Sequence, residues 1–313
     1  MTEQRKVYFN GEYVSETEAR VSIFDAALMF GDMVFEMTRT YNGKPFRLRE
    51  HLERLFASMK MIEIDCGMSL DDMAARTMET LELNAPVIPE SLDIQIMHNV
   101  SRGPLSLYRS VFPEGLRPTV TINCWPMIEH LSWLDGIYES GVHAVLTPQR
   151  SVPARLIDPK IKNRSRIYYQ IANLQAAKID PKAHALLLDE DGYITEGTGD
   201  NFFLVKDGQI RTPEPRNILR GVTRMAVMEL VEEIGIPCTE CNLEPYDVMT
   251  ADEAFFTATS FAILPITRFN GQDISEGTLG PLTNKLISAW SDKVGVDIVS
   301  QAKECAVMAQ ENR

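Results

Sequence analysis

At 313 residues, with 44% hydrophobic and 24% charged side chains, the chain has the composition of a folded globular protein and is long enough for two domains. Collagen-like, coiled-coil and disordered classes are excluded, and no run approaches the roughly 18 apolar residues that a membrane span needs. The formal net charge of −13 opposes binding to nucleic acid or anionic lipid, so an anionic ligand needs a local basic pocket.

The first half of the chain predicts a small α+β domain over residues 1–127. Asn-Gly pairs at 10–11 and 42–43 stand between β-rich runs and are the strongest short signal for a β-hairpin. Apolar residues at positions 52, 55, 56, 59 and 62 recur with the period of a helix. The predicted elements are a hairpin over 7–14, two strands within 39–46, a helix over 48–62, and strands over 92–100 and 118–125.

The second half predicts a larger domain over residues 137–313, joined to the first by a linker over 128–136. The start of one helix, Gly221-Val222-Thr223, offers close backbone approach, free N–H groups and a hydroxyl at the positive end of a helix dipole. This pattern suits a phosphate group, and an ordinary helix cap is the alternative. The predicted elements are strands over 184–188 and 192–195, a hairpin over 202–212, and the helix that begins near Gly221.

The five cysteines are an odd number spread over the chain, which indicates reduced thiols rather than a disulfide framework. Because the first residues also lack the apolar segment of a secretion signal, we expect a cytoplasmic protein. Cys238 and Cys241 have C-x-x-C spacing, but no second pair completes a zinc site. No metal site is predicted, and a redox or metal role for this pair is the minor alternative.

Five segments of the sequence carry motifs in a fixed order. The segment over 22–36, Ser-Ile-Phe-Asp-Ala-Ala-Leu-Met-Phe-Gly-Asp-Met-Val-Phe-Glu, is followed by Arg39 and by His51-Leu-Glu-Arg-Leu55. Thr195-Glu-Gly-Thr-Gly-Asp-Asn201, Leu219-Arg-Gly-Val-Thr-Arg224 and Thr257-Ala-Thr-Ser260 continue in family order. Together these segments resemble class IV aminotransferases of the branched-chain and D-amino-acid type. The resemblance implies an α+β protein of fold type IV, with a small α+β N-terminal domain and a larger pseudo-barrel C-terminal domain. It also implies a pyridoxal 5'-phosphate cofactor in the cleft between them.

Lys162 stands where the family has the lysine that forms a Schiff base with the cofactor. The chemistry needs an amine that can be neutral at roughly physiological pH, which lysine provides and arginine does not. Lys160 is the rival, but Lys162 precedes Glu196 by 34 residues (196 − 162), a separation typical of the branched-chain members. Glu196 resembles the carboxylate that pairs with the pyridine nitrogen of the cofactor.

The resemblance also implies a group of residues that hold the cofactor phosphate. Arg54 matches the family arginine whose planar fork pairs with phosphate oxygens. Val222 and Thr223, through backbone N–H groups and a hydroxyl, and Thr259 are expected to complete the phosphate site. The family tyrosine that contacts the phenolate oxygen falls near Ile167, so neither Tyr168 nor Tyr169 is assigned to that contact.

The expected substrate-binding residues combine several subfamily patterns. Phe30, Phe35 and Arg39 resemble the branched-chain pattern, and Ser260 is expected to contact the substrate. Val100-Ser-Arg-Gly103 instead resembles the D-amino-acid enzymes, whose arginine binds the substrate carboxylate, so Arg102 is a candidate clamp; an exposed loop arginine is the alternative. His98 and Trp125 are expected either to line the cleft or to pack in the core.

The implied activity is transfer of an amino group from an amino acid, preferably branched-chain-like, to a 2-oxo acid through a Lys162 aldimine. A D-amino-acid or (R)-amine transaminase and a 4-amino-4-deoxychorismate lyase are alternatives on the same fold. Relatives commonly carry glutamate where this chain has Ala262, so an (R)-amine donor is among these alternatives. A binding protein without turnover is the non-enzymatic alternative. Family members are usually dimers or larger, so we expect a homo-oligomer whose loop over 102–112 closes the partner's site. The expected partners are the two small substrates, with neither nucleic acid nor membrane.

Overall fold

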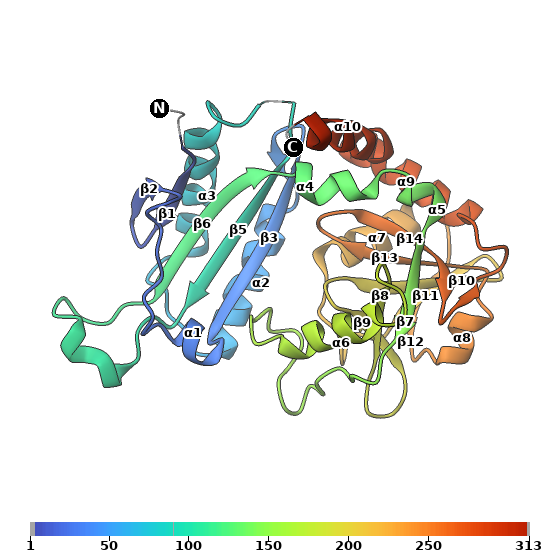
Figure 1. Cartoon of the computed structure of the whole chain (residues 1–313), viewed down its shortest axis with the longest axis horizontal. Helices are drawn as coiled ribbons and strands as arrows, with labels where there is room; N and C mark the ends of the chain where they lie inside the picture. Colours follow the sequence, from blue (N-terminus) through green and yellow to red (C-terminus); the bar gives the residue numbers. More distant parts are fainter. Residues whose placement is uncertain (1–3, 90, 312–313) are drawn as a thin grey trace. The chain divides into compact units, whose positions relative to one another are not determined.

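The computed structural model describes residues 4–89 and 91–311, and the chain forms two compact units (Figure 1). Unit 1 comprises Met1–Met127 and Ile161–Arg166, and unit 2 comprises Ile128–Lys160 and Ile167–Arg313. Residues 128–136, predicted as a linker, contain the short helices α4 (Ile128–Leu131) and η2 (Ser132–Leu134), which pack against α10 (Ile298–Glu311) in unit 2. The sequence-based domain boundaries stay a prediction.

Unit 1 is built on an antiparallel sheet of six strands in the order β2-β1-β6-β5-β3-β4. Both Asn-Gly turns are confirmed, with all four residues at positive φ, as a tight hairpin turn requires. The strands are β1 (Lys6–Phe9), β2 (Glu12–Ser15), β3 (Met33–Tyr41), β4 (Lys44–Pro45), β5 (Ile94–Ser101) and β6 (Thr119–Pro126). The helices are α1 (Ala26–Phe30), α2 (Leu48–Met61), α3 (Leu70–Asn84) and the 3-10 helix η1 (Ser106–Val111).

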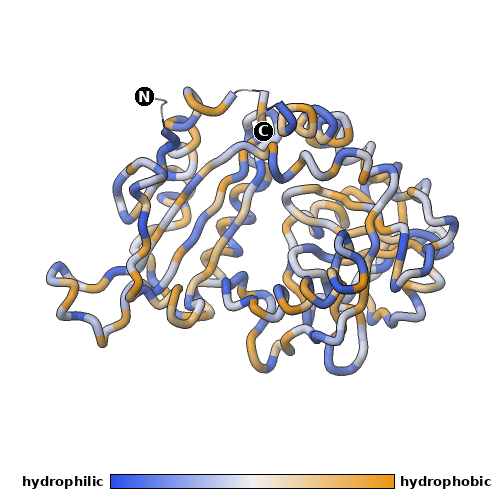
Figure 2. Tube along the Cα trace, viewed as in Figure 1, coloured by the Kyte–Doolittle hydropathy of each residue, from blue (hydrophilic) through white to orange (hydrophobic). Residues whose placement is uncertain are grey.

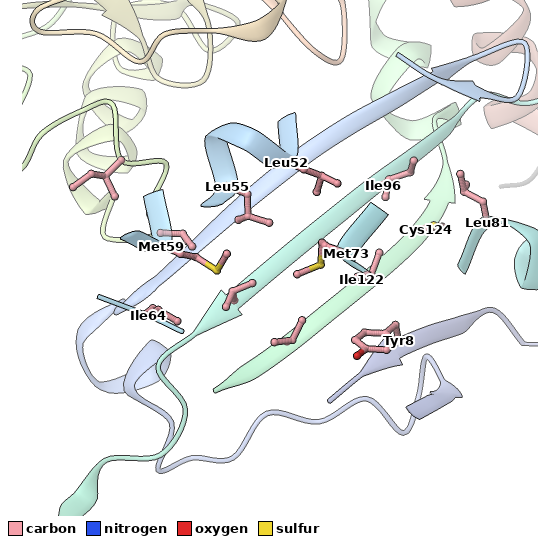
Figure 3. Close-up of a cluster of buried hydrophobic side chains, with 14 residues drawn as sticks. Tyr8, Leu52, Leu55, Met59, Ile64, Met73, Leu81, Ile96, Ile122 and Cys124 are labelled. Carbon is pink, nitrogen blue, oxygen red and sulfur yellow. The ribbon is translucent and has the colours of Figure 1, made fainter. Parts of the chain in front are cut away.

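Helices α2 and α3 cover one face of this sheet and form the core of unit 1 with it (Figure 3). Leu52 and Leu55 of α2 and Met73 of α3 are completely buried against Ile96 of β5 and Ile122 of β6. Val34 of β3 lies in the same cluster. Because successive strand residues point to opposite faces, Phe35 faces away from the helices and Glu36 faces toward them. The predicted helix over 48–62 is confirmed as α2.

Unit 2 is built on a nine-stranded sheet in which six strands close on themselves. The closed order is β10-β13-β14-β7-β8-β9, and the pairing of Asn201 with Glu196 joins β10 to β9. This closure confirms the larger pseudo-barrel domain expected of fold type IV. The strands are β7 (Val142–Leu146), β8 (His184–Leu188), β9 (Ile194–Gly197), β10 (Asn201–Lys206), β11 (Gln209–Pro213), β12 (Cys238–Cys241), β13 (Glu253–Ala258), β14 (Ala262–Phe269) and β15 (Gln272–Asp273).

Large aromatic side chains on adjacent barrel strands are buried, and helices pack around the barrel. Phe202 and Phe203 of β10 and Phe255 and Phe256 of β13 are completely buried, and Figure 2 shows apolar segments along the strands of unit 2. Through the part of the chain that the structure describes, no helix has both the length and the apolar character needed to cross a membrane. The remaining helices of unit 2 are α5 (Ile137–Ser140), α6 (Ile167–Ala177), α7 (Val222–Glu233), α8 (Pro245–Met249) and α9 (Pro281–Val294).

Candidate active site

The backbone of Lys162 is fixed against β3 and α2 in unit 1. The Phe35 N–H donates to the Lys162 carbonyl at 3.0 Å, and the Lys162 N–H donates to Ser58 Oγ at 3.1 Å. Ile161, immediately before it, is buried in the core of unit 1. These contacts direct the Lys162 side chain to the Phe35 face of β3, where its Nζ lies 4.7 Å from the centroid of the Phe35 ring.

Lys160, the rival lysine, lies in different surroundings in unit 2. Its Nζ pairs with Asp158 Oδ1 at 2.7 Å and donates to the Arg216 carbonyl at 3.2 Å. The amine of Lys160 is therefore engaged in a local ion pair that orders its own loop.

Two arginines share the Phe35 ring with Lys162. The guanidinium carbon of Arg164 lies 3.6 Å from the ring centroid and that of Arg166 lies 5.2 Å from it. Burial and the neighbouring charge of Arg166 lower the pKa of Arg164, which nonetheless stays cationic. This cluster is a local concentration of positive charge in a chain of net charge −13, as an anionic ligand requires.

On the helix-covered face of β3, Glu36 forms a buried charge network. Its carboxylate accepts from Arg54 Nε at 2.6 Å and from Arg54 Nη2 at 2.9 Å, and lies 2.8 Å from His51 Nδ1. Burial alone would raise the pKa of Glu36, but the Arg54 charge and the hydrogen bonds of His51 and Arg54 outweigh it and hold that pKa far below its usual range. Burial lowers the pKa of His51, although Glu36 opposes this effect.

Glu196 is held at one end of the unit 2 barrel by three donors. The hydroxyl of Tyr169 donates to it at 2.6 Å, the amide of Asn201 at 3.1 Å and the backbone N–H of Leu219 at 2.9 Å. The side chain is buried, so its carboxylate is fixed in one orientation. Tyr169, left without a role from the sequence, thus contacts Glu196.

The start of α7 lies at the same end of the barrel. Thr259 and Ser260 form the turn between β13 and β14, next to the Asn201–Thr257 pair. A Cβ at Gly221 would lie 2.1 Å from Asn201 Oδ1, so this approach requires glycine.

The first turn of α7 carries backbone donors that the described part of the chain does not use. Val222 and Thr223 are 4% and 5% exposed, and no side chain caps the helix. Within residues 4–89 and 91–311, their backbone N–H groups donate to no protein atom. Buried N–H groups without a partner are costly, so the helix start provides a seat for an anion.

Three of the predicted substrate residues have other surroundings. Arg39 is 1% exposed, stacks 4.3 Å from the Tyr41 ring centroid and lies 3.5 Å from Asp93 Oδ2. Phe30, at the end of α1, is 67% exposed. Arg102 is held through Nε by Asp32 at 2.5 Å, and through Nη1 and Nη2 by two backbone carbonyls at 3.0 and 2.6 Å. Its roles as clamp and loop residue therefore both remain predictions.

The structure thus brings Lys162 together with Phe35 in unit 1, and Glu196 together with the α7 start and the turn over 259–260 in unit 2. Sequence reasoning missed Arg164, Arg166 and the Glu36–His51 pair. Two arginines, two and four positions after the lysine, were the available signal, but a single arginine in a loop usually indicates only a solvated charge.

Cys238 and Cys241 stand at the two ends of β12. Three residues of strand span about 10 Å, which exceeds the roughly 7 Å that a disulfide bridges between Cα atoms. Burial raises the pKa of Cys238 to about 11, which disfavours its reactive thiolate. Among the described residues, no three His, Cys, Asp or Glu side chains are arranged to hold a metal ion.

Comparisons with known proteins agree on one family. Residues 33–269 match the family model described as amino-transferase class IV. A protein of Methanocaldococcus jannaschii with a provisional assignment as a branched-chain-amino-acid aminotransferase is 36% identical over 290 residues, covering 92% of this chain and 96% of that protein. The D-alanine aminotransferase of Bacillus licheniformis is 31% identical over 290 residues, covering 92% and 97%. The T.th. branched-chain amino acid aminotransferase, solved with pyridoxamine 5'-phosphate, superposes with a TM-score of 0.83 at 25% identity and covers 94% of this chain and 95% of that one.

Proposed function

The chain belongs to the class IV aminotransferases, which are pyridoxal-phosphate enzymes, and on this premise we propose that it uses Lys162 to move an amino group from an amino acid to a 2-oxo acid. The observation that supports Lys162 most directly is its fixed backbone, which projects the amine over Phe35. Amino transfer needs one lysine that is both held in place and able to carry a proton.

The residues of the chain fit the cofactor. The unused buried N–H groups of Val222 and Thr223 match the acceptor oxygens of a phosphate, and we propose that Thr259 and Arg54 complete its site. When bound, pyridoxal 5'-phosphate supplies an aldehyde that exchanges amines and a ring that accepts electrons from Cα. Glu196 is proposed to keep the ring nitrogen protonated through the negative charge of its carboxylate. Tyr169, Asn201 and Leu219 hold that carboxylate in one orientation.

The proposed work of Lys162 is proton transfer at the substrate Cα. Its neutral amine removes that proton and, as an ammonium, returns it elsewhere on the reacting system, so one side chain is base and then acid. The Phe35 ring beside Nζ covers one side of the amine and limits its contact with water.

Borohydride labelling tests the assignment of Lys162. Reduction should attach the cofactor to a single peptide that contains Lys162, and Lys162→Arg should abolish both the label and amino transfer. Lys160→Arg is the matched control, because Lys160 lies two positions away and already pairs with Asp158. A label on Lys160, or a label that survives Lys162→Arg, would overturn the assignment.

A branched-chain amino acid is the favoured donor, and a D-amino acid is the second candidate. The similarity to a D-alanine aminotransferase, at 31% identity over 92% of this chain, supports the second candidate. A panel of both enantiomers of alanine, glutamate and leucine, with 1-phenylethylamine, separates these donors from an (R)-amine. Pyruvate formed from 4-amino-4-deoxychorismate without any acceptor would identify the lyase instead.

We further propose a homodimer or larger homo-oligomer in the cytoplasm. The odd number of five cysteines supports a reducing compartment.

Several large apolar side chains of unit 1 are exposed, as a subunit interface predicts: Ile23 at 74%, Leu28 at 64%, Phe30 at 67% and Leu107 at 78%. Light scattering after size-exclusion chromatography tests the assembly, and a monomeric mass would contradict it.

A further inference from the structure

The guanidinium of Arg164 is anchored along one edge on the sheet face opposite the helices. Its carbon stacks 3.6 Å from the Phe35 centroid, and its Nη2 donates to Asn99 Oδ1 at 3.2 Å and lies 3.3 Å from Met97 Sδ. Asn99 Nδ2 in turn donates to Thr121 Oγ1 at 3.2 Å, which directs the Asn99 carbonyl oxygen at Arg164. Strands β3, β5 and β6 therefore all contribute to the position of one arginine.

The remaining donors of Arg164 are unused. The side-chain hydrogen bonds of Arg164 all go through Nη2, so Nε and Nη1 form no hydrogen bond with any residue that the structure describes. No carboxylate in that part of the chain pairs with Arg164, whereas Arg102 pairs with Asp32 and donates to two backbone carbonyls. A planar fork that is held at one edge and lacks an acidic partner is suited to bind a carboxylate through paired, charge-assisted hydrogen bonds.

The positive charge around Phe35 indicates which class of carboxylate substrate Arg164 favours. A monocarboxylic amino acid is a zwitterion of net charge zero, whereas a dicarboxylic amino acid carries −1 and its 2-oxo acid −2. Arg166, at 5.2 Å from the same ring centroid, adds to the positive potential beside Arg164. The potential therefore favours the dicarboxylic partner of the two substrates that an aminotransferase exchanges.

We propose that Arg164 determines specificity by binding the second carboxylate of a dicarboxylic amino donor or 2-oxo acid. The inference rests on the proposed function, because it places that substrate beside Lys162, whose Nζ shares the Phe35 ring. Phe35 is the platform under the guanidinium, and Asn99 is a positioning residue that acts through Arg164. A branched-chain donor and a dicarboxylic acceptor are then compatible, since only the second one needs Arg164.

The kinetic test compares Arg164→Gln with the matched control Arg155→Gln in the cofactor-loaded enzyme. Arg155 is an exposed arginine of unit 2 that pairs with Glu190. We expect Arg164→Gln to raise KM for 2-oxoglutarate about 10- to 100-fold, the usual effect of losing a charged hydrogen bond. With 2-oxopentanoate, a monocarboxylate of the same chain length, kcat/KM should change less than about threefold. Equal losses with both acceptors, or no loss with either, would overturn the proposal.

A binding measurement separates failure of this proposal from failure of the proposed function. Calorimetry with glutarate and valerate, which cannot react, needs no turnover. The wild type should bind glutarate more tightly than valerate, with an affinity that falls as salt rises, and Arg164→Gln should remove the difference. If borohydride labels Lys162 and amino transfer occurs but Arg164→Gln still prefers glutarate, Arg164 has no such role. If labelling and transfer fail while Arg164→Gln removes the preference, the proposed function fails and the carboxylate site stands.

Discussion

Phe35 and Glu36 are neighbours on β3, yet their side chains lie in opposite electrostatic surroundings. On the helix-covered face, Glu36 balances Arg54 and is completely buried. On the other face, Arg164 stacks on Phe35 without an acidic partner in the part of the chain that the structure describes. Glu36 has its counter-charge within the chain and serves the fold. A charge that lacks one is available to a ligand.

Substitutions on the helix-covered face of β3 should lower the unfolding free energy far more than substitutions on the Phe35 face. Glu36→Ala leaves Arg54 and His51 beside an empty buried position, and breaking such a pair costs about 3–5 kcal/mol of unfolding free energy. Urea unfolding of the cofactor-loaded protein measures this loss. Glu53→Ala, which removes an exposed partner of Arg49 on α2, is the control and should cost less than about 0.5 kcal/mol. Similar losses for the two variants would remove the distinction between the faces.

The same buried side predicts a pH dependence through His98. The side chain is completely buried, Thr77 Oγ1 lies 2.8 Å from its Nε2, and burial lowers its pKa to about 4. Because the folded pKa is below the unfolded value of roughly 6.5, the stabilisation is present above pH 6.5 and is lost as the pH falls through 4. The loss is on the order of 3 kcal/mol.

Unfolding free energies measured between pH 7 and pH 4 test this prediction. His98→Gln should remove most of the fall in unfolding free energy that His98 causes at low pH, because glutamine does not titrate. Parallel pH profiles for the variant and the wild type would show that His98 is not the group responsible. The buried position also resolves the sequence-based alternatives for this residue in favour of the core.

Local signals account for what was predictable in the fold. The Asn-Gly turns and the apolar spacing of α2 depend on neighbouring residues alone, so both hairpins and the helix were predicted. Closure of the barrel depends on the pairing of β9 with β10 and of β14 with β7, and the second pair joins segments more than a hundred residues apart, so local patterns do not reveal it. The pseudo-barrel was expected from the family resemblance.

The candidate site divides in the same way. Lys162 and Glu196 were found because they stand in long ordered motifs, whereas Arg164 has no motif of its own. What distinguishes Arg164 is its contact with Phe35 and Asn99, both more than sixty positions away along the chain. Arg102 shows the reverse, because a matching motif did not reveal that Asp32 and two carbonyls already engage it. Motifs report chemistry that is shared by a family, and contacts report what is particular to one chain.

Two variants of different expected effect test how the Phe35 face of β3 positions Arg164. Asn99→Ala removes the acceptor that orients Arg164, at about 1 kcal/mol, and should raise KM for 2-oxoglutarate about 3- to 10-fold. Thr121→Val leaves Asn99 in place but removes the partner of its amide, so the rise should be smaller than with Asn99→Ala. Steady-state kinetics with 2-oxoglutarate and 2-oxopentanoate measure both. A larger rise in KM from Thr121→Val than from Asn99→Ala would contradict the proposal that Thr121 acts on Arg164 only through Asn99.

The smallest expected effect is the stability change of Arg164→Gln. Its hydrogen bonds go to neutral groups and it balances no charge among the residues that the structure describes, so its loss should change the unfolding free energy by less than about 0.5 kcal/mol. Urea unfolding without added dicarboxylate measures this directly, beside Glu36→Ala in the same buffer. With glutarate added, the wild type alone should gain stability, because a ligand that binds only the folded state shifts the equilibrium toward it. A large loss in the absence of ligand would mean that Arg164 serves the fold after all, and the two faces of β3 would then not differ in kind.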